Sequence, residues 1–165
     1  MDKNDTKYPD TKSYNYIISE FDKRGIKLED IAVIAKKVQS KWFPDITQDE
    51  CTQALIKILH EREVMNIVMV ALSLDNLATE GKLPQPLQTI VAKDLWTMGV
   101  DELLAIGLSQ LRGSIAVTNY GHVDVIKHGI IKEIDEDTSR VNTFLDDILG
   151  ALAASVMAHV AHKRA

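Results

Sequence analysis

Cysteine is nearly absent from this chain, since Cys51 is the only one among 165 residues. A lone cysteine excludes an intramolecular disulfide and a zinc site built from several thiolates, so a disulfide-stapled secreted scaffold is not expected. Long uncharged apolar runs are also missing, and the N-terminal stretch lacks the apolar segment of a signal peptide. We therefore expect a cytoplasmic protein that has no transmembrane helix.

Positive charge is scarce as well. Lysine and arginine total 19 against 24 aspartate and glutamate residues, which gives a net charge of −5. Proteins that bind nucleic acids gather positive charge to meet phosphates, so this balance argues against DNA or RNA as a partner. A helix-turn-helix unit over residues 28–60 is the weakest alternative, because it would lack a basic recognition helix. With 8 Gly and 4 Pro, a collagen-like or low-complexity chain is excluded too.

Apolar residues recur at helical spacing along most of the chain, whereas strand signals are nearly absent. Residues 1–13 are polar and predict a flexible tail, followed by one domain over 14–165. Thr47 and Glu50 have the spacing of a capping box, and residues 112–124 are expected to form a loop with at most a helical turn. The fold class predicted is all-α, a compact bundle of six to seven helices. The expected helices cover residues 14–24, 28–43, 48–61, 64–80, 87–96, 101–111 and 142–162.

The last of these expected helices is apolar on every side. Large aliphatic residues cover one arc of its helical wheel, and glycine and alanine fill most of the rest. A helix without a polar face belongs inside a bundle, and its small residues let neighbouring helices approach closely. We therefore expect a buried, central C-terminal helix that the others surround.

Two acidic pairs interrupt apolar helical sequence: Asp101 with Glu102, and Asp146 with Asp147. The simplest explanation is that acids favour the first turn of a helix, where the helix dipole stabilises negative charge. For the first pair, stabilisation of the helix end and a functional role are equally favoured explanations. Stabilisation of the helix end is the weaker explanation for the second pair, because the last helix is expected to be under way already by Val141.

Adjacent helical residues point about 100° apart, so a wholly buried helix cannot send both Asp146 and Asp147 to water. Burying unpaired carboxylates is costly, which requires a cation nearby. A lysine or arginine would serve, but several converging carboxylates also suit Mg²⁺, Mn²⁺ or Ca²⁺. A metal held in this way binds phosphate oxygens, and Asp124 and Lys127 lie in the segment between the two pairs.

The residues over 99–161 resemble the phosphatidylglycerophosphatase A family. The most specific match is the run from Asp124-Val-Ile-Lys127 to Thr143-Phe-Leu-Asp146-Asp147-Ile-Leu-Gly. The chain is similar to the shorter, soluble branch of that family. The resemblance implies an all-helical fold and a Mg²⁺-dependent phosphatase that removes the terminal phosphate of phosphatidylglycerophosphate, with Mn²⁺ or another divalent ion as an alternative.

Carried over by position, the resemblance implies that Asp101, Glu102, Asp146 and Asp147 are metal-binding and catalytic acids. It places Asp124 and Lys127 at the substrate phosphate. Two positions depart from the family pattern: Gly121 stands where the family has an arginine, and His128 where it has a proline. Losing the arginine removes a bidentate phosphate ligand.

Two functions therefore stand side by side. The first is a metal-dependent phosphomonoesterase with a phosphorylated, lipid or soluble, substrate and peripheral contact with a membrane. The second is a catalytically inactive helical binding or regulatory protein that keeps the fold, in which the acids are capped or salt-bridged. Exposed aromatic residues, expected at Trp42, Phe43 and Trp96, also favour a homo-oligomer.

Overall fold

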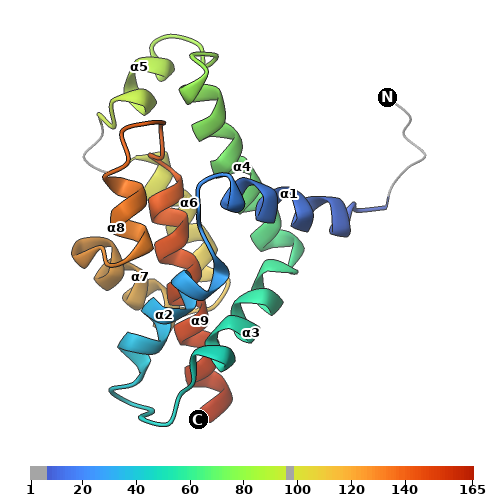
Figure 1. Ribbon diagram of the computed structural model, residues 1–165, viewed down its shortest axis with the longest axis vertical. Helices are drawn as coiled ribbons and strands as arrows, with labels where there is room; N and C mark the ends of the chain where they lie inside the picture. Colours follow the sequence, from blue (N-terminus) through green and yellow to red (C-terminus); the bar gives the residue numbers. More distant parts are fainter. Residues whose placement is uncertain (1–6, 96–98) are drawn as a thin grey trace.

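A computed structural model describes residues 7–95 and 99–165, and this part of the chain contains helices joined by turns and loops, without a strand (Figure 1). The all-α fold class is confirmed. The described residues form nine helices, and the two beyond the expected set, α7 and α8, both fall between residues 112 and 141. The helices are α1 (Asp10–Asp22), α2 (Leu28–Gln39), α3 (Gln48–Leu59), α4 (Arg62–Thr79), α5 (Leu87–Ala92), α6 (Val100–Gln110), α7 (Ser114–Ile126), α8 (Ile130–Asp135) and α9 (Leu145–Arg164).

The N-terminal helices form where the sequence predicts them, and local signals set most of their ends. The Thr47 hydroxyl accepts a hydrogen bond from the Glu50 N–H at 3.1 Å, which confirms Thr47 as the N-cap of α3. Helix α4 ends before Gly81, whose φ of +68° is costly for a residue with a side chain. Helix α1 begins at Asp10 rather than Tyr14. Within the predicted tail, residues 1–6 lie outside the described residues.

Helix α9 is the centre of the molecule, as predicted. It contacts α2, α3, α4, α6, α7 and α8, and every residue from 145 to 158 is buried. In Figure 1 the red helix runs down through the body of the molecule while the others lie around it. The apolar surface of α9 therefore supplies much of the hydrophobic core.

Residues 112–124 are where the predicted secondary structure is wrong. The segment forms most of α7, a helix of 13 residues. Its β-branched residues and Gly121 lower helix propensity. Ala116, Tyr120 and Val123 nevertheless lie on one buried face, which packs against α9. Tertiary packing thus outweighs weak local preference, because burying this face stabilises the helix more than its composition destabilises it.

The start of α9 is also later than predicted. The helix begins at Leu145, not near Asn142, so Asp146 and Asp147 stand in its first turn. A residue from a distant helix caps it: Asp75 of α4 accepts hydrogen bonds from the N–H groups of Phe144 at 3.1 Å and Leu145 at 3.0 Å. These contacts satisfy two backbone donors that would otherwise be buried without partners.

None of the helices in residues 7–95 and 99–165 combines the length and apolar content that crossing a bilayer requires. Of the aromatic residues expected at the surface, Trp42 is 67% exposed. Phe43 packs against the core, with the Arg164 guanidinium 5.5 Å from its ring centre. Trp96 lies outside the described residues. A homo-oligomer stays a prediction.

Candidate metal and phosphate site

The first acidic pair stands at the N-terminus of α6. Asp101 is buried, and Glu102 is half-buried at the third helical position. The Glu102 carboxylate accepts a hydrogen bond from the Gly99 N–H at 2.5 Å, so this glutamate does cap its own helix. The capping explanation therefore holds for Glu102, and the same carboxylate also belongs to the acid cluster described next.

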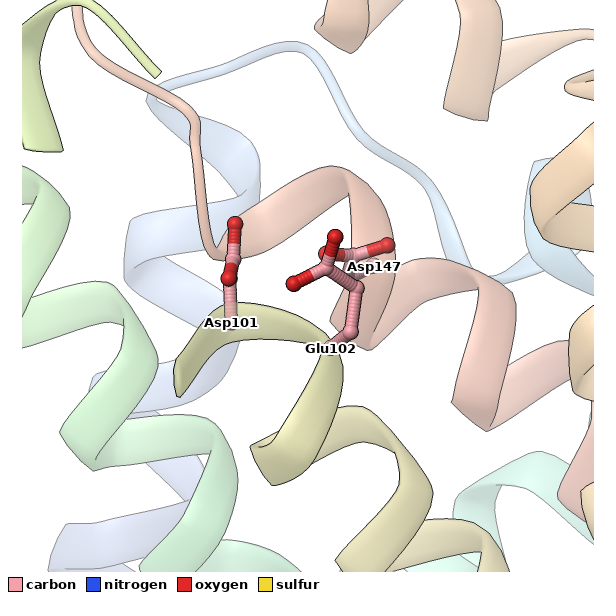
Figure 2. A group of neighbouring side chains, drawn as sticks. All are labelled: Asp101, Glu102 and Asp147. Carbon is pink, nitrogen blue, oxygen red and sulfur yellow. The ribbon is translucent and has the colours of Figure 1, made fainter. Parts of the chain in front are cut away.

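Three of the four acids in the two pairs lie close together in the fold. Asp101 and Glu102 of α6 and Asp147 of α9 each offer a carboxylate oxygen, and these oxygens all lie within 4.8 Å of one another (Figure 2). We call these three residues the acid cluster. The Oδ1 atom of Asp101 is buried and has no hydrogen-bond partner in the described part of the chain. A buried carboxylate oxygen without a donor is costly, so this arrangement has room for a cation that the protein itself does not supply.

Asp146 lies outside the acid cluster and pairs with a lysine instead. Lys127 Nζ donates hydrogen bonds to Asp146 Oδ2 at 2.7 Å and to Asp135 Oδ1 at 2.5 Å. The ion pairs of Lys127 are with Asp146 and Asp135, and it forms none with the acid cluster in the described part of the chain. The structure thus divides the four predicted metal ligands into three that converge and one, Asp146, that is salt-bridged.

A hydrogen bond from a neighbouring helix orients Asp147. The hydroxyl of Tyr120 on α7 donates to Asp147 Oδ1 at 2.9 Å, and both residues are buried. The hydrogen bond engages Oδ1 only, and it leaves Oδ2 of Asp147 available to another partner. Three helices, α6, α7 and α9, therefore build this corner.

An open pocket of about 500 Å³ lies over the acid cluster. All six predicted site residues line it, including Asp124 and Lys127 near the end of α7. Lys127 and Asp94 are the non-glycine residues with positive φ in the described chain, at +36° and +47°, and both line this pocket. Such backbone conformations are unfavourable for these residue types and concentrate at functional sites.

Burial and mutual repulsion raise the pKa of several of these acids and so favour their protonated, uncharged form. Burial and the adjacent Asp146 charge raise the pKa of Asp147 to about 9. Burial, followed by the neighbouring Glu102 carboxylate, raises the pKa of Asp101 to about 7. Burial raises the pKa of Asp146 to about 6, against the opposing effect of Lys127. A carboxylate cluster that resists ionisation in this way gains stability when a divalent cation binds to it.

Lys127 shows the opposite response. Burial disfavours its charged form, but the hydrogen bonds to Asp135 and Asp146 outweigh burial and raise the pKa of Lys127 above its usual value. The lysine is therefore a fixed positive charge beside the acid cluster. It holds Asp146 in place and lowers the negative potential that a phosphate group would meet in the pocket.

Comparison with known proteins identifies the family of the chain. A sequence model of the family named phosphatidylglycerophosphatase A matches residues 33–162, which include every residue of the site described above. The chain belongs to the phosphatidylglycerophosphatase A family. The match covers the acid cluster, the Lys127 ion pairs and the pocket, so these features lie within the family's part of the chain.

Three bacterial proteins are similar to the chain along most of their length. The uncharacterised Bacillus subtilis protein YpjQ is 43% identical to this chain over 140 residues, which cover 85% of this chain and 79% of YpjQ. The uncharacterised Bacillus subtilis protein YutG is 43% identical over 141 residues, which cover 85% of each of the two chains. The crystal structure of YpjQ superposes with a TM-score of 0.90 at 39% identity, over 95% of this chain and 98% of that one. The crystal structure of the low temperature requirement C protein from Listeria monocytogenes superposes with a TM-score of 0.86 at 39% identity, over 94% of this chain and 96% of that one.

Three contributors to the site escaped prediction from sequence. Tyr120 lies in the segment that the sequence predicts to be a loop, so the sequence does not predict its contact with Asp147. Asp75 sits in the apolar run of α4, where an isolated buried acid is itself a signal of a cap or a charge partner. Arg140, in the loop before α9, lines the pocket and had no distinguishing pattern.

Proposed function

We propose that the protein is a metal-dependent phosphomonoesterase that acts on a phosphorylated lipid headgroup, as its family name describes. The observation that carries the proposal is the acid cluster, in which Asp101, Glu102 and Asp147 converge from two helices beneath an open pocket. The partnerless Oδ1 of Asp101 fits a bound cation.

The donor set favours Mg²⁺ or Mn²⁺, because both ions prefer carboxylate oxygens. Asp101, Glu102 and Asp147 would hold the ion. Asp146 stays a predicted fourth ligand, or it is a neighbouring carboxylate that does not bind the ion. When bound, the ion supplies Lewis-acid stabilisation of charge on the phosphoryl oxygens. We expect micromolar binding of at least one of these ions, measured by calorimetric titration.

The chain's own cations would orient the phosphate. Lys127 lines the pocket but is held by two carboxylates, whereas Arg140 lines it without an ion pair among the described residues. A guanidinium binds phosphate through two parallel hydrogen bonds. Gly121, which replaces the family's arginine, does not line the pocket. We propose that Arg140 provides the phosphate contact that Gly121 lacks.

The reaction would break the bond between phosphorus and the ester oxygen. A water molecule contributes the new oxygen on phosphorus, directly or through an aspartyl intermediate, and the leaving alcohol takes up a proton. In the metal-free protein the pKa values of Asp147 and Asp101 are raised to about 9 and about 7, and binding of the ion would displace their protons, so neither is assigned as the acid that protonates the leaving alcohol. The choice between the two nucleophiles stays open.

The test is phosphate release from phosphatidylglycerophosphate and from a panel of soluble phosphate esters, with and without Mg²⁺. We expect metal-dependent turnover of the lipid by the wild-type protein and none by the Asp146→Asn/Asp147→Asn double variant. Asp137→Asn is the matched control, because Asp137 lines the same pocket outside the acid cluster. Wild-type turnover that does not exceed the double variant's would reject the enzymatic function.

A second candidate is the catalytically inactive binding protein. Two observations favour it: Lys127 neutralises Asp146, and Glu102 caps its own helix. Calorimetry distinguishes the candidates. Metal binding without turnover of any phosphate ester would support a binding protein with a retained site, and absence of metal binding would leave the acids a structural role. Cytoplasmic location and peripheral membrane contact stay predictions under both.

A further inference from the structure

A second hollow lies beside the catalytic pocket, on the other side of helix α7. It is a groove of about 260 Å³ between α2 and the C-terminal end of α7. Its apolar lining includes Ile34 and Val38 from α2 and Val123 and Ile126 from α7. Lys37 and Lys41 stand along its edge, and His122 and His128 complete it. We call this hollow the α2–α7 groove.

Residues that are adjacent in sequence to the groove lining expose apolar side chains. Trp42 follows Lys41 and is 67% exposed, with the Lys41 ammonium 5.2 Å from its ring centre. Val125 on α7 is 84% exposed and Ile126 is 42% exposed. Large apolar side chains in such positions cost free energy in water and mark surfaces that bind a partner.

The charge on this surface is positive, against the acidic balance of the whole chain. Lys37 and Lys41 are exposed, and the ion pairs found over the described residues give neither an acidic partner. Exposed lysines flanking an aromatic and aliphatic surface are complementary to a bilayer that contains anionic lipid. Tryptophan settles at the level of the headgroups, and lysine stems reach over the apolar boundary to lipid phosphates.

Helix α7 joins this surface to the catalytic pocket. Residues 123 and 126 line the α2–α7 groove, whereas Asp124 and Lys127 line the pocket over the acid cluster. On the helical wheel, Val125 points outward between these two sides. A membrane that rests on Val125 therefore reaches the groove on one side of α7 and the mouth of the pocket on the other.

We propose that the α2–α7 groove, with Trp42 and Val125, is the surface by which the protein docks on anionic membranes. This rests on the proposed function in one respect, because docking there would bring phospholipid headgroups to the pocket. An acidic peptide is the competing occupant. The exposure of Trp42 and Val125, and the position of Val125 on the helix that carries Asp124, favour the lipid surface.

The test measures partition onto vesicles of phosphatidylcholine with and without phosphatidylserine, in the absence of divalent metal. Phosphatidylserine is not a phosphomonoester, so docking is measured independently of turnover. A basic side chain near anionic lipid contributes on the order of fivefold in partition, so Lys37→Gln/Lys41→Gln should weaken binding about 25-fold. Lys12→Gln/Lys57→Gln is the matched control, since these lysines are exposed on α1 and α3, and it should bind like the wild type.

Fluorescence reports the orientation. In Trp96→Phe, whose one tryptophan is Trp42, the emission should shift to shorter wavelength when anionic vesicles are added. Circular dichroism confirms that each variant is folded. Absence of partition by the wild type, equal weakening by both lysine pairs, or an unshifted emission of Trp42 in Trp96→Phe would overturn the proposal. Binding of a polyglutamate peptide without binding of vesicles would overturn it in favour of the peptide. A phosphatase-inactive protein that docks would leave the proposal standing.

Discussion

Asp147→Asn should stabilise the metal-free protein while removing its response to Mg²⁺. In the metal-free fold, burial and the Asp146 charge raise the pKa of Asp147 from 3.8 to about 9. At pH 7 the folded protein must therefore hold a proton that the unfolded chain releases. Over roughly three pH units at about 1.36 kcal/mol each, this costs about 4 kcal/mol. Asparagine is neutral at every pH, so it avoids that cost.

The replacement keeps the local contacts. The asparagine side-chain oxygen still accepts the hydrogen bond that Tyr120 donates to Asp147 at 2.9 Å, and the two side chains have nearly the same volume. Some of the gain is lost because removing one acid also relaxes its coupled neighbours. We expect the free energy of unfolding to rise by roughly 2 kcal/mol at pH 7, which raises the melting temperature by about 4 to 8 °C.

In Mg²⁺ the wild-type protein should become more stable than Asp147→Asn. A ligand at about 100 times its dissociation constant adds about 2.7 kcal/mol to the free energy of unfolding, because it binds only the folded state. Wild-type protein should gain that stabilisation, and Asp147→Asn should gain little. Thermal unfolding in chelator and in Mg²⁺ measures both effects. Asp49→Asn, in the first turn of α3, is the control for removal of a first-turn charge.

The sign of the pH dependence gives a further check. Between pH 3.8 and about 9 the folded state holds the Asp147 proton more tightly than the unfolded state, so stability falls as pH rises through this window. The advantage of Asp147→Asn should shrink toward pH 4. Strong destabilisation of the metal-free variant, or equal stabilisation of variant and wild type by Mg²⁺, would refute the account of the acid cluster.

Three other predictions concern residues around the site and the N-terminal helices. Burial raises the pKa of Asp75 to about 8, so the matched comparison is with neutral Asp75→Asn: Asp75→Ala should have a free energy of unfolding roughly 1 to 3 kcal/mol below that of Asp75→Asn in urea titrations, because alanine leaves buried N–H groups at the start of α9 without an acceptor; equal stability of the two variants would contradict this. Arg140→Gln should raise KM for a phosphate ester about tenfold or more, with little change in melting temperature or Mg²⁺ affinity; an unchanged KM would exclude the phosphate contact. Burial opposes the charge of Glu20, but hydrogen bonds from Lys23 and Arg24 outweigh it and lower its pKa to about 2. The stabilisation from Glu20 is therefore present above pH 4.5 and lost as pH falls toward 2, so Glu20→Gln should cost roughly 2 kcal/mol at pH 7 and much less near pH 2 in chemical unfolding.

The expectation that the acids of the two pairs need partners follows from sequence, because acids inside apolar helical segments are costly to bury alone. Asp101, Glu102 and Asp147 do converge, and Asp124 and Lys127 line the same pocket. The partners within the chain do not follow from sequence. The pairing of Lys127 with Asp146, across 19 residues, depends on the turn between α7 and α8 rather than on local spacing.

Sequence by itself determined that the protein is all-helical and that α9 is its centre, because a helix without a polar face is stable only where other helices cover it. The same rule could not reveal α7, whose β-branched residues and glycine disfavour a helix until its buried face packs on α9. Nor could it place Asp75 at the start of α9, since that cap comes from a residue 69 positions earlier in the chain. Tertiary structure decided these features because burial and hydrogen bonding act between residues that are close in space. Local sequence patterns do not indicate which distant residues come together in the fold.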